Sequence, residues 1–207
     1  MASNLYYWAN LYDQHKYQAR CIDIETSGYN GYITVITIYT PQEGLIEPLQ
    51  LVYGQNLTSQ NLQSALQGCK LLITFNGKKH DIPRIQQHYP NTLPDVPVLD
   101  LYLFKLNMGA MADLKTLEHH FNIARPDGMD RRGIAVTLWQ RYQKYGDQHA
   151  LAQLLEYNKQ DAINLFPLAE NITKMLRANK SFSKKSVHDI IDDVVEKKKT
   201  RSWRVFE

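Results

Sequence analysis

Asp23 and Glu25 lie two positions apart in the segment CIDIETSG. On a β-strand, side chains two positions apart point to the same face, so these two carboxylates are expected to lie side by side. Like charges that close repel each other and raise a pKa unless a cation lies between them. Mg²⁺ and Mn²⁺ prefer oxygen ligands and suit such a pair. An acidic pair that faces solvent at a strand end is the alternative.

A further carboxylate, Asp81, stands in the segment FNGKKHDIP, directly after the apolar run CKLLITF. A short, continuously apolar run is typical of a strand buried on both faces. We expect this strand beside the first one, which would bring Asp81 to the same end of the sheet. A carboxylate near a helix N-terminus also caps the helix and interacts favourably with its dipole, and this is the alternative role of Asp81.

The third acidic position is Asp161, in the segment EYNKQD. Tyr157 and Asp161 are four residues apart and share one helical face. Leucines between 151 and 165 mark the neighbouring buried face, so we expect Asp161 to be partly buried. A buried carboxylate is costly unless it is paired or bound to a metal. Lys159 lies across the helix and is excluded as its local partner, which leaves a partner elsewhere in the fold as the alternative.

The elements that must position these residues follow from the apolar patterns. Strands are predicted over 18–24, 32–40, 44–53, 69–75 and 97–101. The first three have short connections and suggest an antiparallel meander, with Pro48 indicating an edge or irregularity in the third. Helices are predicted from Thr58 to Gly68, around 84–88, over 114–121 and over 135–142. A last helix begins at Asp147 and runs through Pro167, which would kink it. This order predicts an α/β fold with a mixed central sheet flanked by helices.

The composition is that of an ordinary globular protein, with 207 residues, 43% hydrophobic residues and a net charge of +3. No apolar run approaches the ~20 residues that span a bilayer, and the first residues do not resemble a secretory signal. Cys21 and Cys69 lie beside apolar runs and are expected to be reduced and buried. We therefore expect a cytoplasmic protein that does not contact membranes.

The positive charge is concentrated near the C-terminus. Residues 174–204 contain ten basic and four acidic residues, a net charge of +6, and the remainder carries −3. A basic segment of this kind fits a polyanionic partner, and a solvated tail is the alternative. We divide the chain into an aromatic-rich extension (1–17), a catalytic domain (18–178) and a basic tail (179–207) that could form a short amphipathic helix.

Taken together, the motifs D-x-E, N-x4-D and Y-x3-D resemble, in this order, the three exonuclease motifs of the DEDD superfamily, tyrosine subtype. The segments CIDIETSG, FNGKKHDIP and EYNKQD are similar to the proofreading domain of B-family DNA polymerases. They look even more like the stand-alone RNase-H-like exonucleases of the YprB type. The resemblance covers roughly residues 20–168 and implies an RNase-H-like fold.

The resemblance implies a metal-dependent 3′→5′ exonuclease that releases nucleoside monophosphates from single-stranded ends, with two Mg²⁺ or Mn²⁺ ions. Asp23 would bridge both ions, and Glu25 and Asp161 would complete one site. Asp81 would hold the second ion directly or through water. Tyr157 would orient the attacking water through its hydroxyl group.

Substrate contacts are also implied. The backbone at Thr26 and Gly28 would approach the terminal nucleotide, and Asn76 would hydrogen-bond to it. Lys115 is a candidate phosphate contact, with an ordinary surface lysine as the alternative. His80 replaces the Phe that relatives usually carry before the second-motif Asp, and it would act either as a titratable group near the metals or simply as a packed or exposed aromatic ring.

The sequence leaves DNA or RNA as substrate, the oligomeric state and the pathway open. A protein partner could bind through the aromatic N-terminal segment or the basic tail. The rival functions are a catalytically inactive nucleic-acid-binding or scaffold module and an endonuclease of the wider RNase H group. The exonuclease hypothesis requires the four carboxylates to converge without a fixed lysine or arginine partner.

Overall fold

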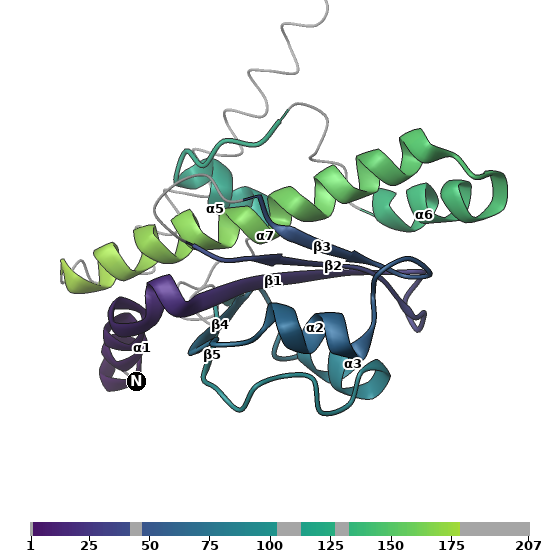
Figure 1. Ribbon diagram of the computed structural model, residues 1–207. Helices are drawn as coiled ribbons and strands as arrows, with labels where there is room; N and C mark the ends of the chain where they lie inside the picture. Colours follow the sequence, from purple (N-terminus) through teal and green to yellow (C-terminus); the bar gives the residue numbers. More distant parts are fainter. Residues whose placement is uncertain (1, 42–46, 103–112, 127–132, 179–207) are drawn as a thin grey trace, which may run out of the picture.

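One mixed sheet forms from the segments rich in apolar and β-branched residues. The computed structural model describes residues 2–41, 47–102, 113–126 and 133–178, so the predicted basic tail and its helix lie outside the described residues. Within these ranges the sheet has the order β3-β2-β1-β4-β5 (Figure 1). Its strands are β1 (Ala19–Thr26), β2 (Ile33–Tyr39), β3 (Leu49–Val52), β4 (Leu71–Thr74) and β5 (Val98–Asp100).

The pairing confirms the predicted fold class. β2 is antiparallel to both β1 and β3, whereas β1, β4 and β5 run parallel. β1 is the middle strand, with the antiparallel meander on one side and the parallel strands on the other. Residues 44–46 of the predicted strand 44–53 lie outside the described residues. Within the remainder, β3 covers Leu49–Val52 and starts directly after Pro48, which cannot donate a ladder hydrogen bond.

Two helices begin at N-cap residues that the sequence predicted. Thr58 accepts a hydrogen bond from the backbone N–H of Asn61, and Asp147 accepts one from that of Ala150. None of the helices among the described residues combines the length and the apolar character needed to cross a membrane. The helices are α1 (Ala2–His15), η1 (Lys16–Gln18, a 3-10 turn), α2 (Ser59–Ala65), α3 (Asp81–His88), α5 (Leu114–His120), α6 (Ile134–Tyr145) and α7 (Gln148–Arg177).

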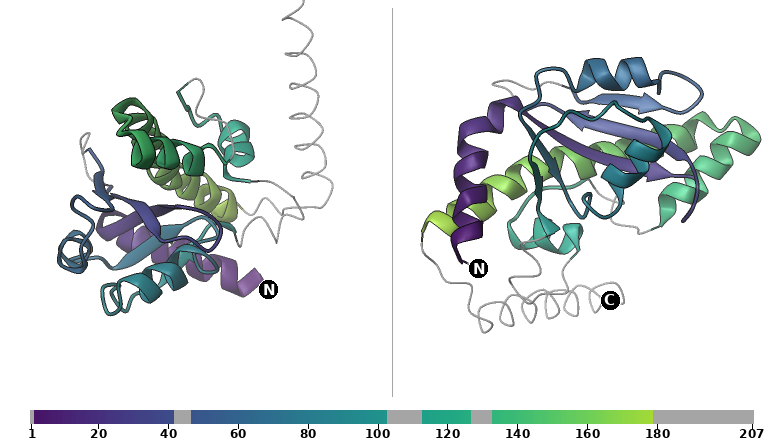
Figure 2. Two further views of the ribbon diagram at one scale, coloured as in Figure 1. Left: turned by 90° about the vertical axis from the view of Figure 1, so that its right-hand side faces the viewer. Right: turned by 90° about the horizontal axis from the view of Figure 1, so that it is seen from below.

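Helices cover both faces of the sheet. α6 and α7 lie on one side, and α2 and α3 lie on the other (Figures 1 and 2). The first half of α7 packs with α6 over β2 and β3, and its second half packs over β1, β4 and β5. The long helix therefore crosses the face of the strands whose carboxyl halves carry the predicted site.

The N-terminal helix packs against this framework. Ala9 and Tyr12 of α1 are buried in the same apolar cluster as Leu71 and Leu99 of the sheet. The Tyr12 hydroxyl donates to Glu170 of α7 over 3.1 Å, and Lys16 forms an ion pair with the same carboxylate at 2.9 Å. α1 is thus held on α7 by both apolar and polar contacts.

Candidate active site

Three carboxylates from β1 and α7 meet on one face of the sheet. Ile22 and Ile24 of β1 pack into the apolar cluster beneath α2 and α3, so the alternation of the strand turns Asp23 and Glu25 toward α7. There they meet Asp161, and one carboxylate oxygen of each lies within 4.8 Å of those of the other two. The structure therefore brings together three of the four predicted metal ligands.

Burial and mutual repulsion make these groups reluctant to ionise. Burial is the largest cause that raises the pKa of Asp23 far above its usual value, followed by the charges of Asp161, Asp81 and Glu25. The pKa of Glu25 rises to about 8, through burial and then Asp161. Burial also raises the pKa of Asp161, against the opposing effect of nearby cations. Such crowded oxygens gain from a divalent cation, which favours their charged forms.

Asp81 is the first residue of α3 and lies beside this group without belonging to it. Among the described residues, the oxygens that gather within 4.8 Å come from the other three carboxylates. Asp81 is nevertheless close enough to raise the pKa of Asp23. Its own pKa rises to about 7, through burial and then Asp100. Its Oδ2 atom is buried and has no hydrogen-bond partner among the described residues, so this oxygen can accept a cation.

Arg125 holds Asp161 from the other side. The Nη2 atom of Arg125 donates to Oδ1 of Asp161 over 2.5 Å and to Oε1 of Glu118 over 2.7 Å. Its Nε atom reaches the second Glu118 oxygen at 2.9 Å, and the arginine side chain is only 6% exposed. The expected freedom of the carboxylates from arginine is therefore not met at Asp161. This contact engages one Asp161 oxygen, and it fixes the carboxylate as outer partners of metal ligands do.

Asn158 is a site residue that the motif comparison missed. Its Nδ2 atom donates to Oδ2 of Asp23 over 2.6 Å, and its Oδ1 atom accepts from the hydroxyl of Thr37. The asparagine is fully buried. Its sequence signal was a polar residue next to Tyr157 on the apolar face of the helix, but its partner lies 135 positions away.

Tyr157 and Lys115 meet at the opening of the site. The Lys115 ammonium donates to the Tyr157 hydroxyl and lies 4.2 Å from the centre of its ring. Burial, followed by the charges of Asp161 and Glu25, raises the pKa of Tyr157, so its phenol stays protonated near neutral pH. A cavity of about 290 Å³ opens here and is lined by Asp23, Phe75, Asp113, Leu114, Lys115 and Asp161.

Of the predicted substrate-contact residues, Lys115 lines this cavity. The Thr26 hydroxyl donates to the carbonyl of Gly28 over 2.9 Å, which closes the turn after β1. Asn76 has a left-handed backbone, with φ of 63°, and its N–H donates to Asp100 over 2.6 Å. His80, which precedes α3, is exposed to solvent. This exposure favours the simple aromatic role for His80.

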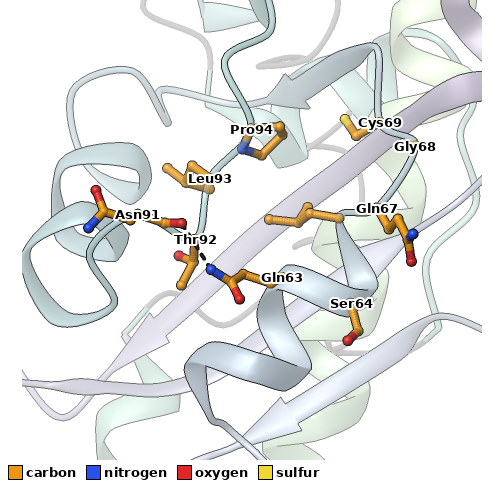
Figure 3. Close-up of a pocket in the computed structure, with 10 residues that line it drawn as sticks. Gln63, Ser64, Gln67, Gly68, Cys69, Asn91, Thr92, Leu93 and Pro94 are labelled. Atoms are coloured by element: carbon orange, nitrogen blue, oxygen red, sulfur yellow. Dashed lines mark hydrogen bonds between the residues drawn. The ribbon is translucent and has the colours of Figure 1, made fainter.

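A second cavity lies away from the carboxylates. It measures about 440 Å³ and is bordered by α2, by the segment that leads into β4, and by residues 91–94 (Figure 3). Gln63 donates across it to the carbonyl of Asn91 over 3.1 Å. Its lining residues are uncharged, and it borders the amino end of β4, whereas Asp81 follows the carboxyl end. It offers no counterpart to the acidic group.

Comparison with known proteins agrees with this arrangement. A family model described as RNase H superfamily matches residues 20–173. The chain belongs to the RNase H superfamily. The matched RNase H superfamily region contains α3 and almost all of β1 and α7, so every predicted carboxylate ligand lies inside this nuclease-type fold. Neither the curated proteins nor the solved structures contain a match to the chain.

Proposed function

We propose that the protein is a divalent-metal-dependent 3′→5′ exonuclease that hydrolyses single-stranded nucleic acid ends to nucleoside monophosphates. The observation that carries this proposal is the meeting of Asp23, Glu25 and Asp161 on one face of an RNase H superfamily fold. The 3′→5′ direction and the tyrosine subtype rest on the resemblance of the three motifs. The same resemblance supports two ions rather than one.

The donor set fits Mg²⁺ or Mn²⁺. Oxygen ligands suit both ions, and the raised pKa values of Asp23 and Glu25 reflect a crowding of negative charge that a cation relieves. Asp23, Glu25 and Asp161 would hold one ion, and the buried Oδ2 atom of Asp81 would contribute to a second. When bound, such ions lower the pKa of a water molecule and neutralise charge on the phosphoryl and leaving oxygens.

The remaining residues would position these groups and the substrate. Asn158 fixes one oxygen of Asp23, and Arg125 fixes one oxygen of Asp161. Tyr157 keeps its proton and can orient a water molecule through its hydroxyl, which accepts a hydrogen bond from Lys115. Lys115 lines the cavity, and its ammonium would contact a phosphate of the bound strand there.

The test is digestion of single-stranded DNA and RNA, labelled at either end, in the presence of Mn²⁺. With a 5′ label we expect a ladder that shortens progressively, and with a 3′ label immediate release of a labelled mononucleotide. Asp23→Ala should lower the rate at least ~100-fold, because losing a ligand costs more than losing an outer partner. The matched control is Asp95→Ala at an exposed position. Equal digestion by both variants would refute the assigned site.

A catalytically inactive nucleic-acid-binding module is the second candidate. The contact of Arg125 with Asp161 favours it, because a guanidinium can neutralise a buried carboxylate in place of a metal. Such a module would bind single strands equally well with EDTA or Mn²⁺ and leave both labels intact. Internal cuts in the same assay would instead indicate an endonuclease.

A further inference from the structure

Two aromatic side chains lie together on the N-terminal half of α1. The rings of Tyr7 and Trp8 meet edge to face, with their centres 5.4 Å apart. Tyr7 is 53% exposed, whereas Trp8 is partly buried against the apolar cluster shared by α1, β4 and β5. Trp8 is therefore anchored by packing while Tyr7 presents its ring to solvent.

A lysine from a distant segment completes this surface. The ammonium of Lys78, in the connection between β4 and α3, lies 4.6 Å from the centre of the Trp8 ring. The backbone N–H of Lys78 donates to the buried carboxylate of Asp100 over 2.9 Å, which fixes the connection in place. Lys79, the next residue, is also exposed. We call Tyr7, Trp8, Lys78 and Lys79 the Trp8 patch.

The Trp8 patch and the candidate active site share one apolar cluster. Phe75 and Leu114 line the cavity that contains Asp23 and Asp161. The same two side chains pack against the apolar cluster on which Trp8 lies. Phe75 is also only three positions before Lys78, so one short segment leads from the cavity to the patch.

We propose that the Trp8 patch binds the part of a single-stranded nucleic acid that extends beyond the end held in the cavity. Aromatic rings stack on bases of any sequence, and lysines beside them contact the phosphates. The pairing of the exposed Tyr7 ring with ammonium groups fits this ligand better than an apolar protein segment, which would leave both lysines without anionic partners. The inference rests on the proposed function, and it adds where the rest of the substrate lies.

The experiment compares strand lengths. Binding of fluorescent single-stranded oligonucleotides, one of 4 and one of 20 nucleotides, is measured by anisotropy in EDTA, so that the result does not depend on cleavage. Tyr7→Ser and Lys78→Gln are the test variants, because neither removes the partly buried ring of Trp8. One stacked base contributes ~1–3 kcal/mol, so the preference for the longer strand should fall about tenfold in Tyr7→Ser. In Lys78→Gln the salt dependence of long-strand binding should weaken by about 0.7 in slope.

The chain offers a matched control far along the sequence. Lys144 lies 5.1 Å from the ring centre of Tyr145, which is 70% exposed at the end of α6. Tyr145→Ser and Lys144→Gln should bind both strands as the wild type does. An unchanged length preference in both test variants overturns the inference. If a protein co-purifies with the wild type and is lost from both variants while strand binding is unchanged, the patch binds a protein, and the inference is also overturned. Failure to cleave any strand would remove the proposed function alone.

Discussion

Arg125 links two buried carboxylates through one guanidinium. Its fork holds Glu118, and the same Nη2 atom reaches Asp161. Asn164 adds a hydrogen bond to Glu118 over 3.1 Å. Burial raises the pKa of Glu118, and the arginine opposes this rise. The arginine therefore opposes the rise in pKa that burial causes at both Glu118 and Asp161.

Replacing Arg125 should cost stability. Arg125→Met leaves two buried carboxylates without their cation, and breaking a buried ion pair on one side typically costs ~3–5 kcal/mol. Denaturant unfolding in EDTA measures this loss. The control is Arg141→Met, whose arginine is 51% exposed and pairs with Asp147, and which should cost at most ~1 kcal/mol. Equal losses in the two variants would contradict the role of Arg125.

At the level of single residues, the sequence predicted the candidate metal ligands more readily than the residues that hold them in place. Asp23, Glu25 and Asp161 stood out because their spacing places them on defined faces of a strand and a helix. A partner for Asp161 elsewhere in the fold was only the alternative to a metal, and Arg125, 36 positions away, follows no local pattern. Asn158 was missed for the same reason, since its role depends on the packing of α7 over β1.

The connection between β4 and α3 depends on a single buried carboxylate. Asp100, the last residue of β5, accepts hydrogen bonds from the backbone N–H groups of Asn76, Lys78 and Tyr102. The connection leads directly into Asp81, at the start of α3. Asp100 thereby couples an edge strand to the position of a predicted metal ligand.

Removing this carboxylate should loosen the whole connection. Asp100→Ala leaves backbone donors without partners, at ~1–3 kcal/mol for each one that stays buried. We expect a loss of at least ~2 kcal/mol in denaturant unfolding, together with weaker Mn²⁺ binding by calorimetry. Asp95→Ala, five positions earlier and exposed, should stay within ~0.5 kcal/mol of the wild type. Unaltered Mn²⁺ affinity in Asp100→Ala would show that the connection between β4 and α3 does not influence metal binding.

The predictions for helices and strands succeeded where the determinants are local. Thr58 and Asp147 begin helices as expected, and α7 continues through Pro167. The strands follow their apolar patterns. β3 begins only after Pro48, because proline cannot donate a hydrogen bond to the neighbouring strand. The left-handed backbone at Asn76 was not foreseen, since it depends on contacts with Asp100.

For the molecule as a whole, the acidic group links stability to pH. The pKa values of Glu25 and Asp81 rise to about 8 and about 7 on folding, from about 4 in an unfolded chain. The folded state therefore binds these protons more tightly than the unfolded state. The stability that this binding contributes is complete below pH ~4 and is lost as the pH rises through 7 and 8.

Metal-free protein should accordingly melt at a lower temperature at pH 9 than at pH 6. We expect a fall of at least about 4 °C, which corresponds to ~1–2 kcal/mol for a chain of this size. Added Mn²⁺ should reverse this fall, and more strongly at pH 9, because only deprotonated carboxylates bind it. Thermal scans with EDTA or MnCl₂ test this, with Glu25→Gln expected to flatten the pH dependence. A melting temperature that rises with pH in EDTA would contradict the assigned shifts.

The division of the chain into an extension, a domain and a tail stays a prediction. The match to the RNase H superfamily covers residues 20–173, and α1 lies before it. The packing of α1 on α7 could not be predicted from the sequence. Tyr12 and Lys16 share one partner, Glu170, which lies far along the chain.

Cys21 lies in β1 two positions before Asp23, and its side chain has no exposed surface. An alkylating reagent can reach this thiol only in molecules where the central strand has opened. The rate of its alkylation therefore reports how often the strand that carries the acidic centre opens, and it can be measured without any substrate.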